Sequence, residues 1–263
     1  MCFNARYLLQ KSLKWALKDG DLPEAELLRK LILELDKDSI IIRDYYQVSA
    51  FAHPKVIVYE NNEFRKPVVS QWGLIPHWAK EPEKIWNSTL NARGETIFEK
   101  ASFKKSAESK RCLVPVEGFY EHHEYKGKKY PFYITRKDDE PLYLAGLWND
   151  WVNPQTGEII NTYSIVTTKA NPMMAKIHNN PKNSNDHRMP VILPENMMED
   201  WLRPLSQKEI QELATYVFPD SKLDSWTVRK LTGKESVGNV PKANEKFEYE
   251  GLVFDDGKEL KLF

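Results

Sequence analysis

Residues 143–167 read YLAGLWNDWVNPQTGEIINTYSIVT, which is two runs of branched and aromatic residues separated by an Asn-Pro-Gln-Thr-Gly segment. Branched and aromatic side chains suit a pleated strand, whereas Asn, Pro and Gly favour chain reversal. The stretch therefore predicts a β-hairpin with its turn at residues 153–157.

Shorter runs of the same kind follow one another from residue 40 onward, each bounded by turn-forming residues. They occupy residues 55–59, 67–69, 111–115, 132–134 and 191–193. Many strands with only occasional helices indicate an α+β fold, in which a mixed and mostly antiparallel sheet curls into an incomplete barrel and the helices are peripheral.

Helical patterns occur in two places. Between residues 7 and 37, leucines recur at helical spacing on either side of Asp19-Gly20-Asp21, which predicts a helical hairpin packed on the body of the protein. Ser206-Gln207-Lys208-Glu209 matches a capping box, so we expect a helix from there to about residue 217.

The composition is that of a globular protein, with 41% apolar and 29% charged residues among 263. No linker, repeat or low-complexity tract divides the chain. We therefore expect one domain over residues 1–263, with residues 7–37 as an insertion and residues 194–263 as a C-terminal extension packed on it. Because 38 basic residues balance 38 acidic ones, any polyanion must be held by a local patch.

The chain contains only two cysteines, Cys2 and Cys112, and no N-terminal segment that combines a basic region, a long apolar run and a cleavage site. No run approaches the roughly 18–20 apolar residues that cross a bilayer. We therefore expect a cytoplasmic protein with free thiols and no membrane contact, and we expect it to act as a monomer.

Cys2 becomes the first residue if Met1 is removed, and it then carries an α-amine and a thiol on neighbouring carbons. The ordinary pKa values of these groups are roughly 7.7–8.0 and about 8.5, so a minority of each is nucleophilic near neutral pH. Such an aminothiol adds its amine to an aldehyde as a Schiff base, and its sulfur then closes a thiazolidine ring. The alternative is a processed terminus without chemistry.

Two stretches near the middle of the chain combine polar and aromatic residues. The segment from Trp72 to Trp78 holds two tryptophans that, if exposed, stack on unpaired bases at about 1–3 kcal/mol each; burial in the core is the alternative. In the stretch Asn91-Ala92-Arg93-Gly94-Glu95-Thr96, Arg93 is suited to clamp a phosphate while Asn91 orients a carbonyl or hydroxyl group. A helix N-terminus with a surface charge pair is the alternative there.

Residues 98–111 carry a local excess of positive charge that is suited to steer a phosphate backbone, although a solvated helix face has the same pattern. Glu121 ends the apolar, aromatic stretch that follows. Partial desolvation there is expected to raise its pKa toward the range of general acid-base catalysis, unless Glu121 is an exposed strand end.

The last candidate residues of the central region are two histidines and one arginine. His178 and His187 are both suited to proton transfer near neutral pH, and Arg188 to phosphate binding, but a lone histidine is also often structural. Adjacent His122 and His123 point in different directions on a strand and no second cluster completes a site, so we expect no metal.

Seven stretches, taken together and in order, resemble the SRAP family, the SOS-response-associated peptidase proteins. They are Met1-Cys2, Trp72 to Trp78, Asn91-Ala92-Arg93-x-Glu95-Thr96, Arg111 to Glu121, Ala145-Gly146-Leu147-Trp148, Thr167-Thr168-x-Ala170-Asn171 and Arg188-Met189-Pro190-Val191-Ile192-Leu193. The resemblance implies an α+β fold with a barrel-like core and a positively charged groove that ends at the N-terminal cysteine.

The resemblance also implies a protein that senses abasic sites in single-stranded DNA during the DNA damage response, without a cofactor. The nitrogen of Cys2 attacks the C1′ aldehyde of the ring-opened sugar, and its sulfur closes the thiazolidine that cross-links protein and DNA. In this pattern Asn91 hydrogen-bonds near the Cys2 amine, and Glu121 relays protons and orients the amine. His178 protonates the sugar oxygen as the ring opens.

Three more residues are implied in DNA binding. Arg93 and Arg188 hold the phosphates that flank the lesion, and Trp72 packs against the strand beside it. The family name also records a self-processing step in which the initiator segment is released to expose Cys2. The protein is thus expected to associate with the nucleoid when it is bound to DNA.

Departures from the family pattern affect two of these assignments. Phe3-Asn4-Ala5-Arg6 replaces the usual Gly-Arg after the cysteine, so the phosphate contact of the early arginine is lost or moves to Arg6. Asp186 stands where the family has a histidine, two residues before Arg-Met-Pro. Because Ile177-His178 keeps the preceding context, we assign the active histidine to His178 rather than His187, with residues 179–187 as an insertion.

Two hypotheses from other classes remain. One is a cysteine hydrolase that uses Cys2 or Cys112 with His178 and Asn91, and it predicts turnover of a peptide or ester. The other is a non-catalytic module for single-stranded DNA, whose affinity is sensitive to salt and indifferent to the lesion.

Overall fold

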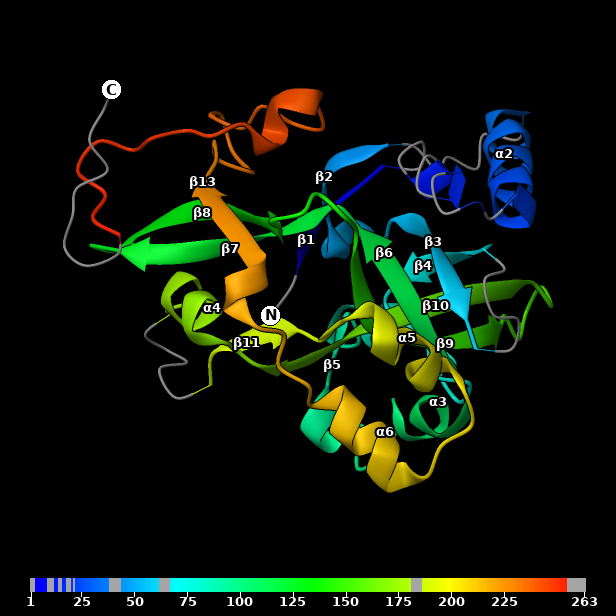
Figure 1. Ribbon diagram of the computed structural model, residues 1–263. Coiled ribbons are helices and arrows are strands. Elements are labelled where there is room, and N and C mark those ends of the chain that lie inside the picture. The colour runs from blue at the N-terminus through cyan, green and yellow to red at the C-terminus, as the bar shows by residue number, and fades with distance from the viewer. Residues whose placement is uncertain are drawn as a thin grey trace.

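The computed structural model describes residues 3–8, 12–13, 16–17, 20, 22–37, 44–61, 67–180 and 186–254. Its centre is a ring of five strands, in which each strand pairs with the next and the last pairs with the first (Figure 1). In order around the ring they are β3 (Lys55–Glu60), β4 (Pro67–Trp72), β10 (Ile159–Lys169), β9 (Leu142–Val152) and β6 (Arg111–Val116). All pairs are antiparallel except β4 with β10.

The expected mixed, β-rich core is therefore confirmed, but its ring is closed rather than incomplete. Closure depends on β9, which pairs with β6 on one side and with β10 on the other. Gly146 lies at this crowded point, where a Cβ atom would come within 2.7 Å of the Cys112 sulfur. A glycine is needed there because no side chain fits between the strands.

The predicted hairpin joins β9 to β10, and its turn lies where the sequence placed it. The Asn153 side chain accepts a hydrogen bond from the backbone of Gln155 at 2.9 Å, and Gly157 has a φ of 73°. An Asx turn followed by a left-handed glycine is the chemistry that an Asn-Pro-x-x-Gly segment favours.

A second sheet contains five strands in the order β13 (Leu223–Thr227), β8 (Lys128–Arg136), β7 (Gly118–Tyr125), β1 (Asn4–Tyr7) and β2 (Tyr45–Ser49). The short strand β1 lies between β7 and β2 and pairs with both. Tyr7 was expected to begin a helix, and that prediction was wrong because residues 4–7 form this central strand. Because β1 is hydrogen-bonded to a strand on each side, the sheet fixes the course of its backbone.

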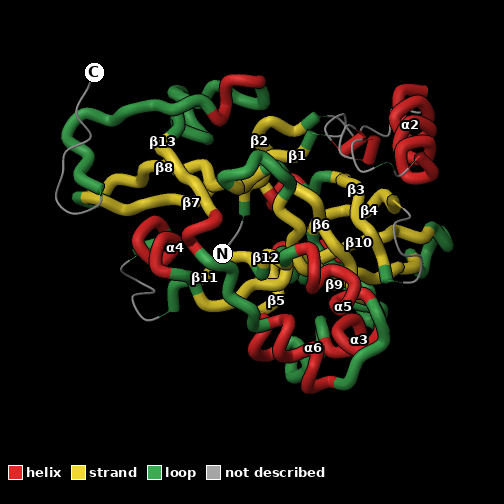
Figure 2. The backbone as a smooth tube through the Cα atoms, viewed as in Figure 1, coloured by secondary structure: helices red, strands yellow, loops and turns green. Residues whose placement is uncertain are grey.

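Three short strands extend the barrel sheet: β5 (Asn91–Arg93) and β11 (Arg188–Pro190) pair with β10, and β12 (Ile192–Leu193) pairs with β9. The α-helices are α2 (Leu22–Lys37), α3 (Lys104–Ser109), α4 (Pro172–Ile177), α5 (Glu195–Leu202) and α6 (Gln207–Ala214). Short 3₁₀ turns occupy Ala50–Ala52, Pro82–Lys84, Trp86–Ser88, Gly94–Thr96, Asp220–Lys222 and Pro241–Asn244. Figure 2 shows the helices at the periphery of the strands.

The capping box before α6 is present, with the side chains of Ser206 and Glu209 each bonded to the backbone of the other, although the helix ends at Ala214. The second half of the expected 7–37 hairpin is α2. In its first half, residues 12–13 and 16–17 are helical and several others lie outside the described residues. Within the described ranges, no helix combines the length and the apolar character needed to cross a bilayer.

Candidate active site and nucleic-acid interface

A pocket of about 220 Å³ lies where β5, β7, β11 and the end of α4 meet the start of β1. The residues that line it are mostly polar or charged: Phe3, Arg93, Glu121, His122, Glu124, Lys129, His178, Asn180, Asp186 and Arg188. Four of the seven site residues expected from the sequence, Arg93, Glu121, His178 and Arg188, are thus brought together from four different elements.

The N-terminal strand leads directly to this pocket. Asn4 pairs with Tyr120 and Ala5 with Phe119, so the same antiparallel register places Phe3 opposite Glu121. The Phe3 carbonyl accepts a hydrogen bond of 2.8 Å from the backbone of Ala50. Phe3 is therefore held at the carboxylate end of the pocket. Cys2 itself lies outside the described residues.

Glu121 lies on β7, and its side chain is almost entirely buried in the wall of the pocket, with 8% of the residue exposed. One of its carboxylate oxygens accepts a hydrogen bond of 3.1 Å from the backbone N–H of His122. The position of Glu121 therefore agrees with the partial burial expected at the end of the apolar run.

His178 follows the last turn of α4, which begins with Pro172 in the first turn and with the Asn171 side chain accepting from the Met174 N–H at 2.8 Å. Its Nδ1 atom lies 3.2 Å from the Arg188 carbonyl oxygen, which only accepts, so Nδ1 carries the proton and Nε2 the lone pair. Burial lowers the pKa of His178, although the nearby Glu121 charge raises it. A neutral imidazole is thus the resting form near pH 7.

His122 is a second imidazole in the same pocket, although its sequence context suggested no role for it beyond a metal site that we did not expect. Burial lowers its pKa; the Glu121 charge raises it, and the charges of Lys129 and Lys230 lower it. His187, the alternative to His178, does not line the pocket, and its Nδ1 atom contacts the His178 carbonyl oxygen at 2.6 Å.

Arg188 is buried, with 4% of its side chain exposed, and forms a two-point ion pair with Glu95 at 2.8 and 2.7 Å. It also donates to the Thr167 carbonyl oxygen at 2.7 Å. Burial raises the pKa of Glu95, but the hydrogen bonds and charge of Arg188 outweigh this and lower it overall. Arg188 is thus anchored inside the protein.

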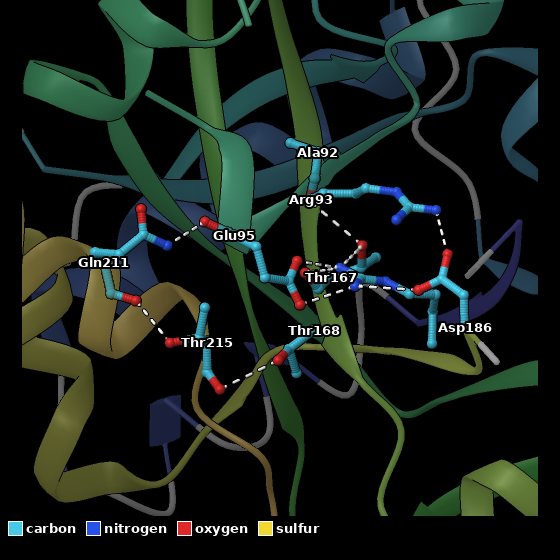
Figure 3. A network of polar contacts seen from close by, with 10 residues as sticks. Ala92, Arg93, Glu95, Thr167, Thr168, Asp186, Gln211 and Thr215 are labelled. Carbon is cyan, nitrogen blue, oxygen red and sulfur yellow. Dashed lines mark hydrogen bonds and ion pairs between the residues drawn. The ribbon is translucent and has the colours of Figure 1, made fainter. Parts of the chain in front are cut away.

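Arg93 is the other arginine, and it faces the pocket from the opposite side of β10. It pairs in register with Thr167, and its guanidinium forms an ion pair with Asp186, as Figure 3 shows. The two side chains are 48% and 40% exposed, so water screens the pair. Asp186 also lies 3.6 Å from the Arg188 guanidinium, so its carboxylate lies between the two arginines.

Asn91 lies on β5 two residues before Arg93, so both side chains leave the strand on the same face. Its backbone pairs with Ile165, two positions along β10 from Thr167, the partner of Arg93. Asn91 is half-buried but does not line the pocket. Gly94 follows, and a Cβ atom there would lie 1.9 Å from the Ala214 carbonyl oxygen, so glycine lets α6 support this segment.

Trp72 does not have the role that the resemblance implied. It is 1% exposed, its Nε1 donates to the Leu90 carbonyl oxygen at 2.9 Å, and its ring stacks on Tyr163. An indole enclosed in this way has no face left for DNA. The core alternative is therefore correct for Trp72, whereas Trp78 is 48% exposed.

Two basic positions also differ from expectation. Arg6 is 9% exposed and bound to Glu117 at 3.1 Å, so the early phosphate contact has not moved to it. In the 98–111 segment, Lys104 and Lys105 lie on the solvated face of α3, while Arg111 is buried and donates to the Trp201 carbonyl oxygen. Neither group reaches the pocket. The lysine that does is Lys129, which sequence reasoning missed.

Cys112 is fully buried, and burial raises the pKa of its thiol, so it is neither reachable nor readily ionised. It is thus a poor nucleophile for the hydrolase hypothesis. Among the described residues, no three His, Cys, Asp or Glu side chains are grouped to hold a metal ion.

The profile of the family described as "SOS response associated peptidase (SRAP)" matches residues 10–235. The chain therefore belongs to the SRAP family.

Among individual relatives, it is 43% identical over 135 residues to the abasic site processing protein YoqW of Bacillus subtilis, covering 51% of this chain and 56% of that protein. It is 34% identical over 154 residues to the abasic site processing protein HMCES of Gallus gallus, covering 50% and 44%. The chain thus spans about half the length of these relatives.

Solved structures agree with the fold. A crystal structure of a protein from Bacteroides thetaiotaomicron is similar with a TM-score of 0.77 and 33% identity, covering 94% of this chain and all of that chain. A protein from Bordetella bronchiseptica, 23% identical with a TM-score of 0.66, supports the fold alone.

Proposed function

We propose that this protein processes abasic sites in single-stranded DNA by forming a covalent cross-link through Cys2 after Met1 is removed. The observation that carries the proposal is the convergence of Phe3, Glu121 and His178 on one pocket. Phe3, which lines the pocket, directly follows Cys2 in the sequence, and this adjacency supports the proposal. The names of the relatives support the substrate.

The reaction joins an aldehyde to an aminothiol with loss of one water. The sugar ring opens, and the Cys2 nitrogen adds to the C1′ carbonyl carbon to give a carbinolamine. A proton delivered to the hydroxyl group lets it leave as water, which gives the imine. The Cys2 thiolate then adds to the same carbon while the imine nitrogen takes up a proton, so the product is a thiazolidine and the lesion is capped.

Two side chains of the pocket are suited to move these protons. His178 rests as a neutral imidazole with its lone pair on Nε2, so it accepts a proton first and then delivers it to the sugar oxygen. Glu121, which lies beside Phe3 in the register of β7 and β1, orients the amine and passes protons during imine formation. Asn91 assists from β5 by hydrogen bonding near the amine.

The two arginines act differently on the DNA backbone. Arg93 holds a phosphate that flanks the lesion by exchanging Asp186 for a phosphate oxygen, since that pair is exposed. Arg188 stays with Glu95 and positions His178 through its carbonyl group.

A pocket of about 220 Å³ suits a sugar without a base. The peptidase in the family description corresponds to self-processing that releases Met1, and it is secondary to the DNA chemistry.

The test incubates the purified protein with single-stranded DNA that contains one abasic site and measures the band that survives denaturation. We expect a cross-link with the wild type and none with Cys2→Ala. Cys112→Ala is the matched control, because it removes the other thiol of the chain, and it should cross-link normally. An unchanged yield from Cys2→Ala would falsify the mechanism, and intact mass should show that active protein has lost its first methionine.

The same assay separates the alternatives. A cysteine hydrolase turns over peptide or ester substrates without holding DNA. A simple binding module gives no band after denaturation and binds intact and abasic strands equally. In Cys2→Ser the amine still forms the imine, but the oxygen closes a less durable ring, so we expect an adduct that is lost faster on dilution.

A further inference from the structure

His122 lies in the pocket beside the residues that the proposed reaction uses. It follows Glu121 on β7 (Gly118–Tyr125), so the two side chains leave the strand on opposite faces. Both nevertheless line the pocket, which lies along the edge of β7 just beyond Tyr120, where the pairing with β1 ends. A molecule in the pocket can therefore contact His122 as well as Glu121.

The imidazole ring of His122 is available to such a molecule. Its backbone N–H donates to the Glu121 carboxylate at 3.1 Å, but within the described part of the chain no group forms a hydrogen bond with its ring nitrogens. The other imidazole of the pocket, His178, already uses Nδ1 on the Arg188 carbonyl oxygen. His122 thus has a nitrogen lone pair that is not engaged by these parts of the protein.

The surroundings of His122 favour its neutral form. Burial has the largest effect and lowers its pKa, the charge of Glu121 raises it, and the charges of Lys129, Lys230 and His178 lower it further. The other charged residues that line the pocket are Arg93, Glu124, Asp186 and Arg188. A neutral imidazole in this place is a base, and it readily gives back a proton that it has accepted.

The two imidazoles are suited to opposite roles. A positive charge on His178 disfavours a second one on His122, so when His178 carries a proton, His122 stays neutral. Two titratable groups that differ in this way can act as acid and base in one step. Opening of the abasic sugar needs both, because the hydroxyl group on C1′ loses a proton while the ring oxygen O4′ gains one. His178 serves O4′ in the proposed function, and the C1′ hydroxyl has no assigned base.

We infer that His122 is a further catalytic residue, the base that serves the oxygen on C1′ of the abasic sugar. As the C1′–O4′ bond breaks, the hydroxyl proton moves to His122, the C1′ carbonyl forms, and O4′ takes a proton from protonated His178. When the Cys2 amine adds to C1′, the same oxygen takes the proton back from His122, while the nitrogen passes one to Glu121. His122 is thus restored. This inference rests on the proposed function and assigns one step of it.

The test measures single-turnover cross-linking to two single-stranded DNAs. One carries the natural abasic sugar, and the other carries an acyclic linker with a free aldehyde, which has no ring to open. In His122→Gln the rate constant with the abasic sugar should fall about a hundredfold, as expected for a lost general base. With the acyclic aldehyde it should fall less than about threefold, because water can supply the proton during amine addition.

Two controls separate catalysis from structure. His77→Gln removes an exposed imidazole outside the pocket and should keep both rate constants within about twofold of wild type. Added imidazole should restore part of the lost rate in His122→Ala, which leaves space for it, but not in His122→Gln, whose side chain fills that space. Thermal unfolding checks that each variant folds.

The outcomes are distinct. Equal losses with both DNAs in His122→Gln would show that His122 only supports the pocket and would overturn the inference, as would a lack of rescue by imidazole. A wild-type protein that cross-links neither DNA would refute the proposed function, and this inference with it. Wild-type cross-linking of the abasic sugar at a rate that His122→Gln leaves unchanged would refute the inference alone.

Discussion

Arg188 and Arg93 lie on the two short strands that flank β10, and each faces a carboxylate, but their surroundings differ. The Arg188 side chain is 4% exposed and bound at two points by Glu95, whereas Arg93 and its partner Asp186 are about half exposed. Removing a partner from a buried charge costs far more than removing one at the surface. Burial, not residue type, therefore decides which of the two guanidinium groups is accessible at the surface.

The largest effect should come from breaking the buried pair. Arg188→Gln leaves Glu95 without its two-point partner and the Thr167 carbonyl oxygen without its donor, so we expect the free energy of unfolding to fall by about 3–5 kcal/mol. Chemical denaturation measures it. The double variant Arg188→Met with Glu95→Leu removes both charges and should recover much of the loss; a double variant as unstable as the single one would contradict this account.

Breaking the exposed pair should change the affinity for DNA more than the stability of the protein. Arg93→Gln changes the free energy of unfolding by less than about 1 kcal/mol, because water already screens the pair. It should nevertheless reduce the affinity for abasic single-stranded DNA several-fold, measured as the protein concentration that gives half-maximal cross-linking. Asp186→Asn is the companion variant: it removes the competing carboxylate and should increase that affinity. A loss of affinity in Asp186→Asn would show that Asp186 supports the site instead.

The smallest effect is expected from a change of pH. The stability that the buried Arg188–Glu95 pair contributes should depend on pH. The pKa of Glu95 is lowered in the folded protein, so the stabilisation by its charged form is present above its ordinary value of 4.5 and is lost as the pH falls through the lowered pKa. The difference in unfolding free energy between wild type and Glu95→Gln should be constant near neutral pH and shrink below pH 4.5.

Local patterns predicted all the strands of the barrel ring, β3, β4, β6, β9 and β10. The runs at 55–59, 111–115 and 132–134 all fall inside observed strands, and the 153–157 turn is where Asn, Pro and Gly placed it. These predictions succeed because strand and turn preferences depend on neighbouring residues. Strand β1 was not predicted, because four residues are too few to show an alternating pattern. They also precede a leucine-rich segment whose spacing is helical.

The sequence named four residues that the structure brings to one pocket, but it did not indicate how exposed each of them is. One pocket is lined by Glu121, His178, Arg93 and Arg188. Three other expected contributors lie outside it: Trp72, Arg6 and the lysines of α3. A sequence motif marks which residue types occur together. It does not state which ring faces the core or which guanidinium already has a buried carboxylate.

The β-rich character of the protein, the position of its main turn and the resemblance to its family could all be read from the sequence, because each depends on residue types at short range or in a set order. The closed barrel, the position of Phe3 opposite Glu121, the burial of Arg188 beside the exposed Arg93, and the place of Lys129 in the pocket could not. These features depend on contacts between residues up to about a hundred or more positions apart, and burial and electrostatics at such contacts are set only when the strands pair.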